Sequence, residues 1–206
     1  MILYKTIDKA VSAEQVIEKS KFIAHVSPAN TKEAGDAFIT KIKSENKGAT
    51  HNVPAMVIGD KFQIQWASDD GEPQGTSGAP IVQMIVSQGI TNIVVVITRY
   101  FGGVKLGTGG LVRAYTSSAK LAIEAAGIIE IREMESFDVK FDYCYLNKLQ
   151  NIGLTEDFSI DHVKYTDIVN VTLSTVPENS ENLENILNNV TNGTAKILNR
   201  KVLQTR

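Results

Sequence analysis

Cysteine and long hydrophobic segments are nearly missing from this sequence of 206 residues. Its only cysteine, Cys144, has no internal disulfide partner and cannot build a Cys-rich zinc site, which fits a reducing compartment. The longest aliphatic run, Ile93 to Ile97, is far shorter than the roughly 20 residues of a membrane-spanning helix. Charged residues interrupt the N-terminus from Lys5 onwards, so it does not resemble a signal peptide. We therefore expect a cytoplasmic protein without membrane contact.

A strong charge of one sign is also lacking. The formal net charge is −2, which gives no general attraction to nucleic acid or to an anionic membrane. Residues 1–134 hold 14 basic and 13 acidic side chains, whereas residues 135–206 hold 7 and 10. If the protein binds RNA, a local patch in the N-terminal part must therefore provide the contact.

Hydrophobic periodicity predicts a mixed α+β fold for the N-terminal part. One or two strands are expected over residues 15–26, and single strands over residues 55–58, 62–66 and 93–98. Helices are expected over residues 31–45, 79–86 and 111–126. Thr31 has the residue type and position of an N-cap for the first helix. The segments 68–78 and 99–110 are rich in glycine, so we expect both to be loops.

The pattern changes from about residue 136. Strands are expected over residues 137–142, 158–165, 168–176 and 195–203, and helices over residues 143–152 and 181–190. This order, strand-helix-strand-strand-helix-strand, is the ferredoxin-like arrangement. The length of the chain suits two small domains. Charged residues cluster over 132–136, so we place the division there and expect domains over 1–134 and 135–206.

Four sequence strings resemble the IMPACT family. They are K-S-K-F (19–22), H-N (51–52), S-D-D-G-E-P-Q-G-T (68–76) and R-Y-F-G-G-V-K-L-G-T-G-G-L-V-R-A-Y (99–115). The last string is long and rare in composition. The resemblance covers residues from about 15 to 126, and the remainder is similar to the C-terminal domain of bacterial members.

The resemblance implies a fold and a role. The N-terminal domain would be like the second domain of ribosomal protein S5, and the C-terminal domain like a ferredoxin-like domain of elongation factor G. Eukaryotic relatives regulate translation under starvation by competing for a scaffold that activates an initiation-factor kinase. We therefore expect a non-enzymatic binding or regulatory protein linked to translation or stress response. Its partner would be RNA, the ribosome or another protein, and no cofactor is expected.

The sequence departs from the family pattern at two places. Val53 follows His-Asn where the family commonly has cysteine, so a thiol mechanism in the N-terminal domain is excluded. Residues 77–80 read Ser-Gly-Ala-Pro where the family commonly has Ala-Gly-Lys-Pro, so one positive charge is missing from this loop.

The candidate binding surface consists of the charged, aromatic and glycine residues of these strings. They are Lys19, Lys21, His51, Asp69, Asp70, Glu72, Thr76, Arg99, Tyr100, Phe101, Gly102, Gly103, Lys105, Gly107, Gly109, Gly110 and Arg113. Glycine-rich loops that open helices make anion sites, because backbone N–H groups there are free. Helices are expected to start after residues 75–80 and near Gly110, so phosphate is a candidate ligand. The spacing matches neither a Walker A motif nor a dinucleotide fingerprint.

Other roles are open for the same residues. The glycines would serve only turns and packing if Arg99 and Arg113 pair with the acidic residues of the first loop. Asp69, Asp70 and Glu72 would instead suit Mg²⁺ in a phosphate- or nucleotide-handling enzyme. His51 beside Asp69 or Asp70 would be a general base, although no nucleophile is marked nearby.

Contacts to RNA and to proteins have their own candidates. Strand alternation would place Lys19 and Lys21 on one face and Phe22 on the other. Tyr100 and Phe101 are candidates for exposed aromatics that stack on bases, whereas Trp66 is expected in the core. A protein-binding module that uses the C-terminal sheet is a further alternative. If strands 62–66 and 93–98 run in the same direction, the two glycine-rich loops lie side by side. Asp69, Asp70 and Glu72 would then face Arg99, Lys105 and Arg113, and these opposite charges would hold the two loops together.

Overall fold

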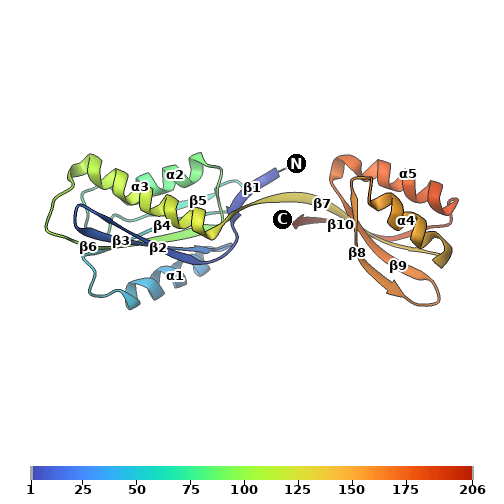
Figure 1. The fold of residues 1–206 in the computed structure, drawn as a ribbon, viewed down its shortest axis with the longest axis horizontal. Helices are drawn as coiled ribbons and strands as arrows, with labels where there is room; N and C mark the ends of the chain where they lie inside the picture. The colour runs from blue at the N-terminus through green and yellow to red at the C-terminus, as the bar shows by residue number, and fades with distance from the viewer. Residues whose placement is uncertain (1, 206) are drawn as a thin grey trace. The chain divides into compact units, whose positions relative to one another are not determined.

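The computed structural model describes residues 2–205, which separate into two compact units (Figure 1). One unit spans Tyr4–Glu130, and the other contains residues 131–205 together with Ile2 and Leu3. Both combine helices with a sheet, so the fold is α+β as predicted. None of the helices described is both long and apolar enough to cross a bilayer. The predicted domains, 1–134 and 135–206, stay a prediction about independent folding.

The first unit contains an antiparallel sheet of five strands. Their order across the sheet is β2 (Val11–Ile17), β3 (Ser20–Pro28), β6 (Ile93–Tyr100), β4 (His51–Ile58) and β5 (Ile64–Ala67). Both β5 and β6 pair antiparallel with β4, so they run in the same direction. Each of them leads into a glycine-rich segment, and the two segments therefore leave the sheet at the same edge.

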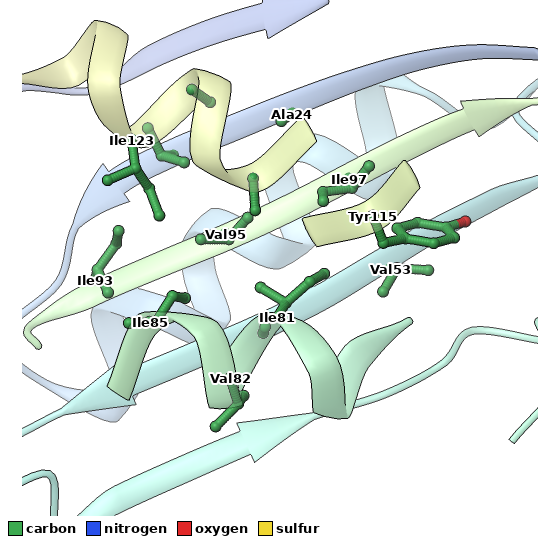
Figure 2. Packing of buried hydrophobic residues seen from close by; sticks show 14 of the residues in the cluster. Ala24, Val53, Ile81, Val82, Ile85, Ile93, Val95, Ile97, Tyr115 and Ile123 are labelled. Carbon is green, nitrogen blue, oxygen red and sulfur yellow. The ribbon is translucent and has the colours of Figure 1, made fainter. Parts of the chain in front are cut away.

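Strand β6 is buried on both faces, because helices cover the sheet on both sides. Helix α1 (Lys32–Glu45) lies on one face, and α2 (Gly78–Ser87) and α3 (Gly107–Ala126) lie on the other (Figure 1). Successive β6 side chains point to opposite faces, so the continuous run of β-branched residues fills two cores. Ile93, Val95 and Ile97 pack with α2 and α3, as Figure 2 shows, whereas Val94 and Val96 pack with α1.

Several element boundaries differ from the prediction. Strand β1 (Ile2–Ile7) was not expected. Of the one or two strands predicted over residues 15–26, the structure has two, joined by a turn at Glu18 and Lys19. Both turn residues have positive φ. Helix α3 starts at Gly107, four positions before the expected start. Glycine lowers helix propensity without preventing a first turn, and a Cβ on Gly110 would lie only 3.0 Å from the Leu106 Cβ.

The second unit follows the predicted order of elements. They are β7 (Ile128–Phe141), α4 (Leu146–Gly153), β8 (Phe158–Tyr165), β9 (Val169–Thr175), α5 (Ser180–Thr191) and β10 (Lys196–Thr205). A 3₁₀ turn, Tyr143–Tyr145, precedes α4, and another, Pro177–Asn179, precedes α5. The sheet order is β1-β7-β9-β8, with β10 also paired to β7. Residues 132–136, where the charges suggested a boundary, are part of β7 and pair with β10.

The β2–β3 turn fits closely against the second glycine-rich segment. A Cβ built on Gly102 would lie 1.9 Å from the carbonyl oxygen of Lys19, and that oxygen belongs to backbone. We expect Gly102→Ala to lower the free energy of unfolding by about 1–3 kcal/mol, the range for overpacking. Urea denaturation measures this change. Gly48→Ala is the matched control, because a Cβ there meets nothing within 4 Å. If Gly102→Ala and Gly48→Ala unfold at the same urea concentration, the close contact at Gly102 is contradicted.

Candidate functional site

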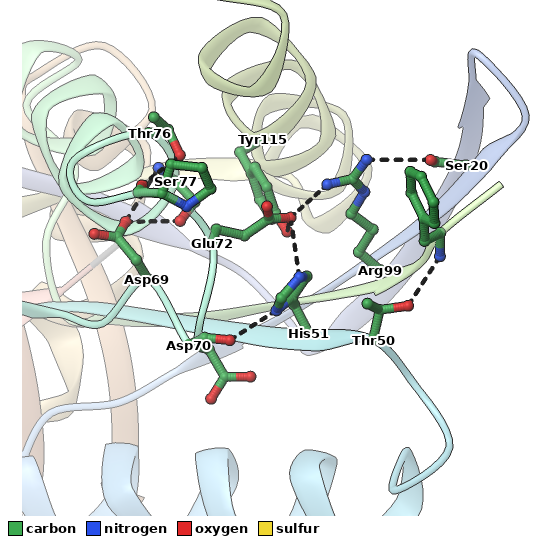
Figure 3. Close-up of polar contacts among 12 residues, drawn as sticks. Ser20, Thr50, His51, Asp69, Asp70, Glu72, Thr76, Ser77, Arg99 and Tyr115 are labelled. Atoms are coloured by element: carbon green, nitrogen blue, oxygen red, sulfur yellow. Dashed lines mark hydrogen bonds and ion pairs between the residues drawn. The ribbon is translucent and has the colours of Figure 1, made fainter. Parts of the chain in front are cut away.

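A buried ion pair joins the two glycine-rich segments. Glu72 follows β5 and Arg99 lies near the end of β6, and their Oε1 and Nη1 atoms are 2.6 Å apart (Figure 3). Their side chains are only 4% and 6% exposed. Water screens such a pair poorly, so each charge depends on its partner. The prediction that acidic and basic residues hold these two segments together is confirmed for this pair.

Hydrogen bonds from other elements complete the pair. The Tyr115 hydroxyl, on α3, donates to Glu72 Oε1 at 2.7 Å. On the other side, Arg99 Nη2 donates to Ser20 Oγ at 3.3 Å, and the same hydroxyl accepts from the Gly102 N–H at 3.2 Å. Burial raises the pKa of Tyr115, and its bond to the Glu72 carboxylate raises it further. Tyr115 therefore remains a protonated donor.

Aromatic rings enclose the guanidinium of Arg99. Its Cζ lies 5.3 Å from the ring centroid of Phe22 and 5.4 Å from that of Phe101, both within cation–π range. Phe22 meets Tyr115 edge to face at 5.3 Å. One donor is left over: Arg99 Nε is buried and has no hydrogen-bond partner among the described residues. Arg99 is thus a buried cation paired with Glu72, and only a small part of it reaches the surface.

Asp69 caps α2. Its carboxylate accepts hydrogen bonds from the backbone N–H of Gly75 at 2.7 Å and of Gly78 at 2.9 Å, and from the N–H and hydroxyl of Ser77. Burial raises the pKa of Asp69, but these hydrogen bonds to the charged form outweigh it and lower the pKa overall. The predicted phosphate site at the start of α2 is therefore wrong, because the chain's own carboxylate fills it.

Asp70 and His51 tie the first segment to β4 and α1. Asp70 Oδ1 pairs with Lys43 Nζ at 2.5 Å, and Oδ2 accepts from the Asn52 N–H at 2.6 Å. His51 Nδ1 lies 2.8 Å from the Asp70 carbonyl, which only accepts, so Nδ1 carries the hydrogen. His51 Nε2 is 3.8 Å from Glu72 Oε1. This arrangement gives His51 a linking role between β4 and the first segment.

The acidic residues do not converge on one point. Asp69, Asp70 and Glu72 each bond to different groups, and no cluster of three metal-ligand side chains exists between residues 2 and 205. Thr76 is likewise bonded within its own loop, since its hydroxyl donates to the Pro73 carbonyl at 2.6 Å. The arrangement therefore gives the Mg²⁺ interpretation no geometric support.

The glycines of the second segment have different roles. Gly102 is in close contact with the Lys19 carbonyl. Gly103 and Gly107 have φ of +87° and +68°, a region that favours glycine. Gly109 and Gly110 lie in the first turn of α3, where a loop was predicted.

The two lysines of the first motif do not share a strand face. Lys19 lies in the β2–β3 turn with φ of +64°, so strand alternation does not apply to it. Lys21 lies on β3, and its Nζ pairs with Glu14 Oε2 at 2.7 Å. Lys19 is exposed, whereas Phe22 is buried in the core.

The remaining aromatic residues lie near the surface. The Tyr100 hydroxyl donates to Asn46 Oδ1 at 3.3 Å, and Phe101 is 47% exposed. The expectation that Trp66 belongs to the core is wrong. It is 42% exposed, because β5 is an edge strand of the sheet.

Among the described residues, Lys105 and Arg113 are not bonded to the acidic residues of the first segment. Both are exposed, and within the described chain neither forms an ion pair. Their predicted pairing with the first loop is therefore wrong. Lys105 and Leu106 border two neighbouring hollows of about 370 and 430 Å³. Phe101 and Thr108 line the first hollow and Arg113 lines the second.

Sequence reasoning missed two members of the buried network, Tyr115 and Ser20. Both lie inside the strings that carry the family resemblance, so membership of those strings was the available signal. Periodicity alone places Tyr115 on the buried face of α3 and says nothing about its hydroxyl.

We expect Glu72→Ala to lower the free energy of unfolding by about 3–5 kcal/mol, because it leaves Arg99 buried without a partner. Tyr115→Phe, which keeps the ion pair, should cost less, about 1.5–3 kcal/mol for one hydrogen bond to a charged group. Adding Arg99→Met to Glu72→Ala should restore part of the loss, since the unpaired charge is then gone. Denaturant unfolding measures all three. A double variant that is no more stable than Glu72→Ala would contradict the coupling.

The Asp69 cap should make stability depend on pH. At pH 7, Asp69→Ala should lower the free energy of unfolding by about 0.5–2 kcal/mol, the usual effect of losing a cap. The pKa of Asp69 is lowered in the folded protein, so this contribution is complete above the unfolded value of 3.8 and is lost below it. The difference between wild type and variant should therefore shrink as the pH falls below 3.8. A difference that stays constant down to pH 3 would exclude an ionised cap.

Two family models match the chain. Residues 18–123 match the Impact N-terminal domain, and residues 139–194 match a domain of unknown function, DUF1949. The first match contains both glycine-rich segments and the whole buried network around Glu72 and Arg99.

Individual proteins agree with these matches. IMPACT family member YvyE of Bacillus subtilis is 40% identical over 86% of this chain and 81% of its own length. IMPACT family member YigZ of Escherichia coli is 33% identical over 68% of this chain and 70% of its own length. Protein IMPACT of Mus musculus is 33% identical over 43% of this chain and 29% of its own length. A crystal structure described as that of a hypothetical protein aligns with a TM-score of 0.60 at 27% identity, covering 95% and 96% of the two chains. The chain belongs to the IMPACT family.

Proposed function

We propose that this protein is a non-catalytic RNA-binding protein that acts on translation. Its contact surface is the basic face, defined as Lys19, Phe101, Lys105 and Arg113. The observation that carries the proposal is that the three cations of this face are exposed and have no ion-pair partner within residues 2–205. Exposed cations without partners are free to neutralise RNA phosphates.

The basic face also has the rigidity and the aromatic group that RNA contact requires. The buried pair of Glu72 and Arg99 lies beneath Phe101 and fixes the segment that carries Lys105. An exposed aromatic ring offers a stacking surface for unpaired bases. The net charge of the whole chain is then irrelevant, because the contact is local.

Family membership supports a role in translation. The resemblance implies an N-terminal fold like the second domain of ribosomal protein S5 and a C-terminal fold like a domain of elongation factor G. The antiparallel strand order β10-β7-β9-β8 in the second unit is what a ferredoxin-like domain has, and it supports the second likeness. Regulation of translation under stress, in the cytoplasm, fits these likenesses.

An enzyme that handles phosphates through a carboxylate-bound metal is the alternative left open by the sequence. It requires free carboxylates that converge on one cation. Instead, Asp69 caps α2, Asp70 pairs with Lys43, and Glu72 pairs with Arg99. The metal would require these carboxylates to leave their present partners. RNA binding at the basic face requires no such change, and we prefer it for this reason.

Replacing Lys19, Lys105 and Arg113 together by alanine should weaken binding to a single-stranded RNA oligonucleotide. Each lost phosphate contact lowers the slope of log K against log salt by about 0.7, so three lost contacts should lower it by about 2. Filter binding between 50 and 200 mM salt measures the slope, at concentrations for which salt effects are large. Sedimentation with ribosomes at low and high salt tests the link to translation.

The control carries the same change of charge elsewhere. Lys9, Lys41 and Lys61 are exposed and lie outside the basic face, so their joint replacement by alanine should leave the slope unchanged. Equal effects of the two triple variants would show that only net charge matters and would overturn the proposal. Neither variant should melt at a lower temperature than the wild type, because none of the six side chains is buried.

A further inference from the structure

Helix α3 begins without a cap, unlike the other helices of the first unit. Thr31 Oγ1 accepts a hydrogen bond from the Ala34 N–H at the start of α1. Asp69 Oδ1 accepts one from the Gly78 N–H at the start of α2. The N-cap residue of α3 is Leu106, whose side chain has no acceptor. The first N–H groups of α3, a helix of 20 residues, therefore have no capping partner within the described structure.

Cations gather at this helix start, which is the electrostatically unfavourable end for them. The N-terminus of a helix carries partial positive charge and favours anions. The first turn of α3 contains no acidic residue, and Lys105 precedes it. Arg113 Nη1 reaches back to within 3.7 Å of the position that a Cβ on Gly109 would occupy. Such an arrangement costs stability in the free protein, and a bound anion would reverse that cost.

A cavity of about 370 Å³ lies at the same helix start, which is within the size range of small-ligand sites. Thr108 and Lys105 provide polar groups at its wall, while Phe101, Leu106 and Leu111 provide apolar surface. Glu72 also lines the cavity, and its charge is balanced by Arg99. Arg99 also lines this cavity. Only 5% of that residue is exposed, and its Nε–H has no partner in the part of the chain that the structure describes.

We propose that this cavity binds a nucleotide through its phosphate. The phosphate accepts hydrogen bonds from the free N–H groups of α3 and the Thr108 hydroxyl, next to the Lys105 ammonium. The base lies against Phe101 and the leucines. This inference rests on the proposed RNA contact and makes it specific, because the same chemistry belongs to a free nucleotide and to the 5′-phosphorylated end of an RNA strand.

The test uses the full chain and four probes. They are AMP, adenosine, and one RNA decamer with either a 5′-phosphate or a 5′-hydroxyl. We expect the phosphorylated decamer to bind at least about tenfold more tightly than the hydroxyl form, since hydrogen bonds to a charged group are lost without the phosphate. AMP should compete with the phosphorylated decamer, and adenosine should not. Fluorescence anisotropy with a 3′-labelled decamer measures each affinity.

A pair of variants locates the site. Thr108→Glu places a carboxylate in the first turn of α3, where it suits the helix and repels phosphate. Thr108→Gln has nearly the same shape without the charge. Thr108 is exposed, so neither change should lower the melting temperature. We expect the glutamate variant to lose the preference for the 5′-phosphate and the glutamine variant to keep it within about threefold, a difference that reports charge alone.

The outcomes separate this inference from the proposed function. If both decamers bind equally and AMP does not compete, the nucleotide site is wrong although RNA binding stands. If AMP binds to the wild type and not to Thr108→Glu, while neither decamer binds, the site is that of a free nucleotide and the RNA proposal falls. Retention of the 5′-phosphate preference by the glutamate variant would place the phosphate elsewhere and overturn the inference.

Discussion

The buried ion pair between Glu72 and Arg99 is the interaction on which the rest of the site depends. Taking both charges out of water is costly, and it is offset only if each charge has good partners. Tyr115 supplies a hydrogen bond to Glu72 and Ser20 supplies one to Arg99. As a result, one cluster connects β3, β6, α3 and the segment after β5, although these lie far apart in the sequence. The shape of the surface above the cluster follows from this connection.

The basic residues of the long motif therefore divide into two kinds. Arg99 is buried and neutralised, so its charge has a structural use. Lys105 and Arg113 belong to the same motif, yet they are exposed and unpaired in the described chain. The division follows from position: Arg99 belongs to a central strand that helices cover, whereas the other two belong to the edge where the strand gives way to α3. A charge count of the motif cannot distinguish these two uses.

Much of the fold could be predicted from the sequence. Periodicity located most helices and strands, and the order of elements in the second unit is confirmed. The meeting of the two glycine-rich segments was predicted on the condition that β5 and β6 run in the same direction, which they do. Side-chain contacts were harder, because they depend on distant residues. Asp69 can cap α2 only because its loop folds back onto the start of that helix. Trp66 is exposed because β5 lies at the edge of the sheet. The turn at Lys19 required two residues with positive φ that composition did not indicate.

The chemistry of the buried cluster has a consequence for how the family can change over evolutionary time. A single substitution at position 72 or 99 leaves one charge without its partner, which is strongly unfavourable. Joint replacement by apolar residues of similar volume avoids this penalty, so these two positions should vary together or not at all. The hydroxyl of Tyr115 has no acceptor once Glu72 is gone, so phenylalanine is then the compatible neighbour. Lys105 and Arg113 have no such tie to the interior, so this penalty does not limit their variation among relatives.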